Sequence, residues 1–96
     1  MSIRLVVTFT AAPGKGAELA KAFEQRAAEC RKEHGCEQFD IFQGTTNSDH
    51  VVLLERWSDQ TALDAHAKLN RTRPPLDPAL RADTGAREDY EYNRTR

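Results

Sequence analysis

Three side chains suited to proton chemistry or ring binding fall within twelve residues, in the stretch ERWSDQTALDAH from Glu55 to His66. The carboxyl of Glu55 and the imidazole of His66 can accept a proton, and the indole of Trp57 offers a flat apolar surface with one N–H donor. An imidazole has an unperturbed pKa of about 6.5, so His66 can serve as a base near neutral pH. Whether the three side chains meet depends on the elements that carry them.

A strand followed by a helix is predicted around this stretch. The residues HVVLLERW, at 50–57, are rich in β-branched and apolar types and indicate a strand. The turn residues at 44–49 join it to a strand at 36–43 in a hairpin. Ser58 can cap the helix that follows, expected at about 59–69, with Asp59 in its first turn.

The spacing of the candidate residues places them on facing surfaces of this strand and helix. Glu55 and Trp57 are two residues apart in a strand, so they point to the same face of the sheet. His66 is three residues from both Leu63 and Leu69, so it shares their expected inward stripe on the helix. The three side chains are therefore expected to lie close together at the corner between strand and helix.

The order of the remaining elements predicts the fold class. A strand is expected at 3–10, a helix at 17–34 ended by Gly35 in the C′ position, and a last strand at 86–95. Asp77 is expected to cap a short helix at 78–83. The resulting βαββαβ order is the ferredoxin-like arrangement, an α+β fold with both helices on one face of a four-stranded antiparallel sheet. All 96 residues are expected to form one domain.

The strands carry apolar side chains on both faces of the predicted sheet. Val52 and Leu54 alternate with Val51 and Leu53 in the third strand, and Val6 alternates with its apolar neighbours in the first. Two helices on one face leave the other face uncovered, and a large exposed apolar face favours aggregation. We therefore expect a homodimer in which two sheets pack face to face.

Composition and motifs exclude several classes of partner and cofactor. The formal charge of −1, from 14 basic and 15 acidic residues, gives no reason to expect binding to nucleic acid or to a membrane. The amino terminus lacks the features of a secretory signal, so a cytoplasmic protein is expected. Two cysteines and three histidines show no ligand spacing, and the glycines form no phosphate loop, so neither a metal nor another cofactor is predicted.

The segments VVTFTAAPGKGAEL, HGCEQFDIFQ and LLERWSDQTALDAH, between Ile3 and about Leu69, resemble the antibiotic biosynthesis monooxygenase domain family. The resemblance implies a dimeric α+β barrel built from ferredoxin-like halves. It also implies a cofactor-independent monooxygenase, in which a deprotonated small quinol or phenol reduces dioxygen itself. The protein then needs an apolar pocket, a base, and a polar group that stabilises the developing anion.

On this basis His66 is the candidate base, and Glu55 is the group that orients it or tunes its pKa. An alternative for Glu55 is a salt bridge to an arginine across the dimer. For Trp57 and His66 the alternative is a purely structural place in the core. Arg71 and Arg73 are expected at the pocket rim, either receiving an acidic substrate or solvated. The predicted walls of the substrate pocket are Trp57, Phe9, Phe39, Tyr90, Leu53 and Leu63.

Departures from the family pattern leave other functions open. Members that oxidise aromatic polyketides carry an asparagine and two tyrosines where this chain has Leu53, Ile41 and Leu63. The asparagine of the haem-degrading branch is replaced by Val7, and no histidine follows the second helix, so haem is not predicted. The aliphatic set favours a second hypothesis, a non-catalytic dimer that binds a small molecule. A third is an isomerase or degradative enzyme that acts on a small carbonyl compound through His66 without oxygen.

Overall fold

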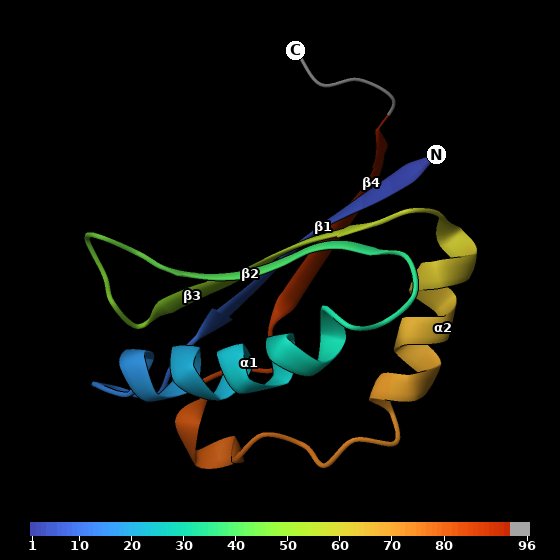
Figure 1. The fold of residues 1–96 in the computed structure, drawn as a ribbon. Helices are drawn as coiled ribbons and strands as arrows, with labels where there is room; N and C mark the ends of the chain where they lie inside the picture. The colour runs from blue at the N-terminus through green and yellow to red at the C-terminus, as the bar shows by residue number, and fades with distance from the viewer. Residues whose placement is uncertain (93–96) are drawn as a thin grey trace.

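The computed structural model describes residues 1–92, which fold as a four-stranded antiparallel sheet with two helices on one side (Figure 1). The strands occur in the order β2-β3-β1-β4, which is the ferredoxin-like arrangement predicted from the sequence. No helix in this part of the chain is long and apolar enough to cross a membrane. In chain order the elements are β1 (Ser2–Thr10), α1 (Gly16–Cys30), β2 (Cys36–Gln43), β3 (His50–Trp57), α2 (Gln60–Asn70), the short 3₁₀ helix η1 (Pro78–Leu80) and β4 (Ala86–Tyr92).

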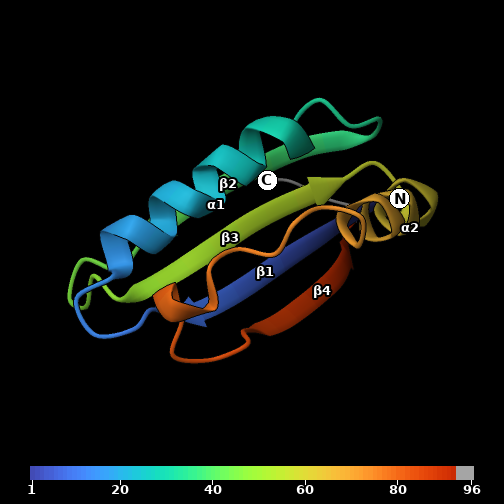
Figure 2. The ribbon, with the colours of Figure 1, turned by 90° about the horizontal axis from the view of Figure 1, so that it is seen from below.

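The two helices cover different parts of the same side of the sheet. Seen from that side, α1 runs along β2 and β3, whereas α2 lies near one end of the strands (Figure 2). The connection at 71–77 leaves α2 and passes across the sheet to η1 on the same side (Figure 2). Helix α1, helix α2 and the connection at 71–77 therefore cover the helix side of the sheet. The candidate residues lie where these three segments meet the sheet.

Strand β3 alternates between its two faces in the way that period-two geometry requires. Val51, Leu53, Glu55 and Trp57 are all buried toward the helices, and the residues between them are half-buried on the other face. In the ladder, Glu55 pairs with Leu5 on β1 and with Phe39 on β2. A carboxyl group therefore stands within an apolar layer, in the middle of the sheet.

Helix α1 ends at Cys30, four residues before the predicted end at residue 34. The backbone N–H groups of Lys32 and Glu33 donate to carbonyls three residues earlier, which tightens the chain and ends the α-helix. Gly35 has a φ of +82° in the turn that follows, and a Cβ at this position would lie 2.4 Å from the Cβ of Ala62. The close approach of this turn to α2 requires glycine there.

Helix α2 begins one residue later than predicted, and its cap is Asp59 rather than Ser58. The Asp59 carboxylate accepts a hydrogen bond of 2.8 Å from the backbone N–H of Ala62. Leu63 and His66 are buried as predicted, but Leu69 is 44% exposed, so it does not share their inward stripe. Asp77 caps η1 as predicted, although η1 is only three residues long. Of the strand expected at 86–95, residues 93–95 lie outside the described part of the chain.

The face of the sheet away from the helices carries the apolar side chains predicted for it. Val6, Val52 and Leu54 are half-buried there in the isolated chain, and Phe42 is 51% exposed. Tyr90 on β4 pairs with Arg4 on β1, which places it on this same open face. Both helices lie on the other side of the sheet (Figure 1).

Candidate functional site

A cavity of about 630 Å³ lies between the helix side of the sheet, the two helices and the segment that follows α2. Its sheet wall is apolar except for Glu55 on β3 and Arg87 on β4, and α2 contributes His66. A volume of this size accommodates a small organic ligand. Six of the residues predicted for the site line the cavity: Phe9, Phe39, Leu53, Glu55, Leu63 and His66.

Trp57 lies behind the site and does not line the cavity. Its side chain is fully buried, and the indole stacks on the His66 imidazole with ring centroids 4.4 Å apart. The indole N–H donates a hydrogen bond of 3.0 Å to Oε1 of Glu55. Trp57 therefore supports the two candidate catalytic groups from the core side, where its N–H is satisfied.

The prediction that Tyr90 forms a wall of this cavity is wrong. The register of β4 against β1 places Tyr90 on the open face of the sheet, opposite the side that carries the cavity. The side chain is 50% exposed, and its hydroxyl donates to a carboxylate oxygen of Glu88 on the same strand.

The group that contacts His66 directly is Glu33, which the sequence analysis did not identify. The His66 Nδ1 atom is 3.0 Å and 3.2 Å from the two carboxylate oxygens of Glu33. Glu33 lies in the turn after Cys30, and this turn aims its side chain at α2. No local motif marks the residue, because its partner is 33 positions away in the sequence.

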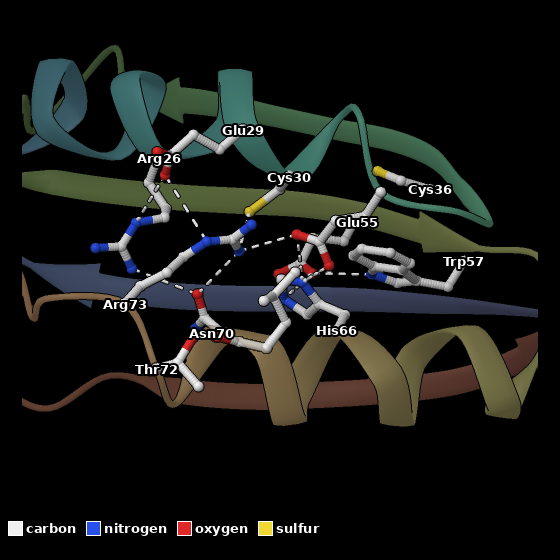
Figure 3. A network of polar contacts seen from close by, with 12 residues as sticks. Arg26, Glu29, Cys30, Cys36, Glu55, Trp57, His66, Asn70, Thr72 and Arg73 are labelled. Carbon is white, nitrogen blue, oxygen red and sulfur yellow. Dashed lines mark hydrogen bonds and ion pairs between the residues drawn. The ribbon is translucent and has the colours of Figure 1, made fainter.

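Arg73 also contacts the Glu33 carboxylate that faces His66. The Arg73 Nη1 atom is 2.9 Å from Glu33 Oε2, and both side chains are largely buried, with 13% and 11% of their surface exposed. The same nitrogen lies 3.4 Å from the Cys30 sulfur and 3.4 Å from Asn70 Oδ1 (Figure 3). The contact between the guanidinium and the carboxylate of Glu33 has the geometry of a charge-assisted hydrogen bond.

The Arg73–Glu33 pair decides which nitrogen of His66 carries the hydrogen. An ionised carboxylate only accepts hydrogen bonds, so the Nδ1 atom of His66 must donate to Glu33. The neutral ring then has its lone pair on Nε2. This nitrogen is 4.0 Å from Glu55 Oε1, a separation too long for a hydrogen bond. His66 is thus oriented with its basic nitrogen on the Glu55 side of the ring.

Glu55 faces the cavity as a carboxyl group that burial favours in its neutral form. Burial raises its pKa above the ordinary value, and the hydrogen bond from Trp57 and the charge of Arg87 oppose that rise only in part. The predicted orienting contact between Glu55 and His66 is replaced by the contact from Glu33. Glu55 instead lies close to the basic nitrogen without bonding to it.

The donor atoms of Cys30, Glu33 and His66 lie within 4.8 Å of one another, which is close enough to suggest a metal site. Two observations argue against that use. The guanidinium of Arg73 already contacts both Glu33 and Cys30, so a cationic side chain already pairs with two of the three donor groups. Burial also raises the pKa of the Cys30 thiol to about 12, and a thiol binds metal as the thiolate.

Comparisons with solved structures give the fold many relatives. The chain is similar to PA3566 from Pseudomonas aeruginosa, with 28% identity, a TM-score of 0.80, and coverage of 97% of this chain and 95% of that one. Rv0793 from Mycobacterium tuberculosis is 21% identical, with a TM-score of 0.80 and coverage of 99% and 98%. A structure described as an antibiotic biosynthesis monooxygenase is 19% identical, with a TM-score of 0.75 and coverage of 96% and 99%.

No curated protein matches the chain. The model of one protein family, described as antibiotic biosynthesis monooxygenase, matches residues 2–73. That span runs from the start of β1 through α2 to Arg73, and it includes Glu33, Glu55 and His66. Because the match covers most of the sequence and the site residues lie within it, the chain belongs to the antibiotic biosynthesis monooxygenase family.

Proposed function

We propose that this protein is a cofactor-independent monooxygenase that oxidises a small phenol or quinol with dioxygen. The observation that carries the proposal is the buried Arg73–Glu33–His66 series beside an apolar cavity. This series of contacts leaves His66 with a lone pair on Nε2, the nitrogen nearer Glu55. A positioned imidazole of this kind is suited to remove a phenolic proton. Membership of the family supports this class of chemistry.

The proposed reaction begins when His66 Nε2 takes the proton of the substrate hydroxyl. The resulting phenolate is electron-rich and transfers an electron to dioxygen, and the two radicals then combine to form a carbon–oxygen bond. Loss of water from the hydroperoxide at a ring carbon that bears hydrogen leaves a quinone carbonyl. One oxygen atom thus enters the product and the other leaves as water, and the substrate supplies all four electrons.

Glu55 has a role in this scheme as a neutral hydrogen-bond donor. Its Oε1 atom accepts the Trp57 N–H, so a proton on Oε2 can point toward the substrate oxygen. A donor in an apolar cavity stabilises the charge that develops when His66 removes the proton. The raised pKa of Glu55 keeps that proton in place at higher pH than an ordinary glutamate would.

We also infer that two chains associate through the open faces of their sheets. Val6, Val52, Leu54 and Phe42 form the apolar part of this face, and they are half-buried or exposed in the isolated chain. A second copy of the same face would cover them symmetrically. In such a dimer the cavity stays on the outer, helix side of each sheet, and Tyr90 would belong to the interface.

The test is oxygen consumption by purified protein, freed of metal by a chelator, on a panel of hydroquinones and naphthols. We expect uptake above the spontaneous rate, and we expect His66→Ala to abolish the enzymatic part. Thermal unfolding of both proteins checks that the variant is folded. Full activity in His66→Ala would exclude this residue as the base, and an absence of uptake on every substrate would contradict the proposal.

A second candidate function is supported by the apolar character of the sheet wall. Val7 and Leu53 present aliphatic side chains to the cavity, and the polar side chains of the sheet wall are Glu55 and Arg87. Such a cavity suits a dimer that binds a small molecule without turnover. Binding of a naphthol without oxygen uptake would favour this function. Turnover that continues in the absence of oxygen would instead favour an isomerase or a degradative enzyme.

A further inference from the structure

We propose that the substrate carries a carboxylate at the end remote from its reacting hydroxyl, and that Arg81 binds this carboxylate. The inference deepens the proposed function, because it assigns a substrate class to the same cavity. It rests on the charges around the cavity, on the contacts of Arg81, and on the distance between the two ends of the site.

The polar part of the cavity wall is strongly basic. It includes five arginines but only one carboxyl group, that of Glu55, whose pKa burial raises. Some of this positive charge is neutralised within the protein, because Arg73 pairs with Glu33 and Arg87 pairs with Asp89. The five arginines are Arg26, Arg71, Arg73, Arg81 and Arg87.

Arg81 differs from the paired arginines in having a buried donor with no partner. Its Nε atom is inaccessible to solvent and forms no hydrogen bond within residues 1–92, and no carboxylate in that range forms an ion pair with its side chain. The guanidinium lies over the Phe9 ring, 5.8 Å from its centroid. A buried donor is normally satisfied, so an unpartnered one that borders a cavity points to a ligand.

The position of Arg81 sets the length of the ligand. Phe9, beneath Arg81, is four residues from Leu5 on β1, which corresponds to about 13 Å along a strand. Leu5 pairs with Glu55, beside the basic nitrogen of His66. The floor between the two ends is apolar, with Val7 and Leu53 paired across β1 and β3. A ligand that reaches both ends has a two-ring apolar body with a hydroxyl at one end and an anion at the other.

A carboxylate fits this end of the cavity better than other anions. A guanidinium binds a carboxylate through two parallel hydrogen bonds, and the buried Nε of Arg81 is one of the donors for such a pair. Arg81 offers a single unpaired positive charge beside an aromatic ring, so a monoanion balances it. A doubly charged phosphate would place an uncompensated negative charge in this partly apolar environment.

The test compares two biphenyl probes by isothermal titration calorimetry. Both carry a phenol hydroxyl at one para position, and the opposite para position carries either a carboxylate or a carboxamide. We expect the wild-type protein to bind the carboxylate at least tenfold more tightly. Arg81→Gln should abolish this ratio and Arg81→Lys should retain part of it. Lys21→Gln, which removes an exposed positive charge from α1 outside the cavity, should leave the ratio unchanged.

Equal binding of the two probes to the wild-type protein would overturn the inference. The inference would also fail if the folded Arg81→Gln variant kept the preference for the carboxylate over the carboxamide. Failure of both probes to bind, or tighter binding of the corresponding phosphonate, would overturn it as well. Oxygen uptake is measured separately on the carboxylate probe. A preference for the carboxylate probe that depends on Arg81, without oxygen uptake, would support the ligand class and contradict the monooxygenase. Oxygen uptake without that preference would support the monooxygenase and contradict the ligand class.

Discussion

The His66 imidazole meets a different group on each of its sides. Its Nδ1 atom contacts the Glu33 carboxylate, its face stacks on Trp57, and its Nε2 atom is 4.0 Å from Glu55. The first two contacts fix the orientation of the ring and the position of its hydrogen. Glu33 is therefore a positioning residue, and it acts in the proposed reaction only through His66.

Glu33→Gln tests this positioning role. The amide keeps the size of the side chain but removes the charge that fixes the hydrogen on Nδ1, so we expect kcat for oxygen uptake to fall by about tenfold to a hundredfold. The KM should change little, because Glu33 does not line the main cavity. The control is Glu18→Gln on α1, whose side chain is 61% exposed and pairs with Lys15, away from Arg73 and His66. An unchanged kcat in Glu33→Gln would contradict the role assigned to Glu33.

Glu55 is expected to make stability depend on pH. Its pKa is raised in the folded protein, so the native state retains a proton that the unfolded chain has already released. The contribution of Glu55 to the free energy of unfolding is therefore greatest below the ordinary pKa of 4.5, and it is lost as pH rises through the raised value. Glu55→Gln has no proton to release, so the variant does not lose this part of the free energy of unfolding as pH rises.

Urea unfolding across the acidic to neutral range measures the effect. The difference in unfolding free energy, variant minus wild type, should increase as pH rises, whereas Glu37→Gln on the exposed surface should show no such trend. A difference that stays constant with pH, or that decreases, would show that the folded protein does not favour the neutral form of Glu55.

At the scale of elements, most of the fold could be predicted from the sequence. The third strand was predicted with its observed bounds, and its alternation placed Glu55 and Trp57 on the helix side. The end of α1 could not be predicted, because the polar residues at 31–34 are compatible with a helix as far as Gly35, while the packing of Gly35 on Ala62 requires a turn there. Glu33 was missed for the same reason, since its orientation depends on where the helix ends.

The beginning of α2 offers a test of the assigned cap. Asp59→Ala removes the hydrogen bond to the Ala62 N–H and should lower the free energy of unfolding by about 1 kcal/mol. Ser58→Ala is the matched control, because its side chain is not the cap, and it should have a smaller effect. Chemical denaturation of both variants measures the difference. A larger loss for Ser58→Ala would show that the cap is Ser58, as the sequence first suggested.

At the scale of the whole molecule, the two faces of the sheet differ in the side chains that they carry. The helix side carries the cavity, and the open face carries apolar side chains that a second chain would cover. Tyr90 shows why sequence alone could not assign every residue to a face. Both faces of β1 have apolar positions, so only the pairing of Tyr90 with Arg4 decides which face the tyrosine joins.

Leu54→Asp tests the assembly inferred for the open face. A buried aspartate at a symmetric interface would leave two negative charges close together without partners, so we expect the dimer to dissociate. Light scattering after size-exclusion chromatography measures the mass. The matched control is Leu69→Asp on α2, where the leucine is already exposed and lies away from the open face. A wild-type monomer, or a Leu54→Asp variant that stays dimeric, would contradict this assembly.

The most direct test of the central claim is the pH dependence of oxygen uptake by wild-type protein and by His66→Gln, corrected for spontaneous oxidation. If His66 only removes the phenolic proton, the wild type should be faster by about a hundredfold or more at neutral pH. That ratio should fall toward one as pH approaches the phenol's own pKa of about 10, where the substrate no longer needs a base. A ratio that stays constant with pH, or equal rates at neutral pH, would contradict the assignment of His66 as the base.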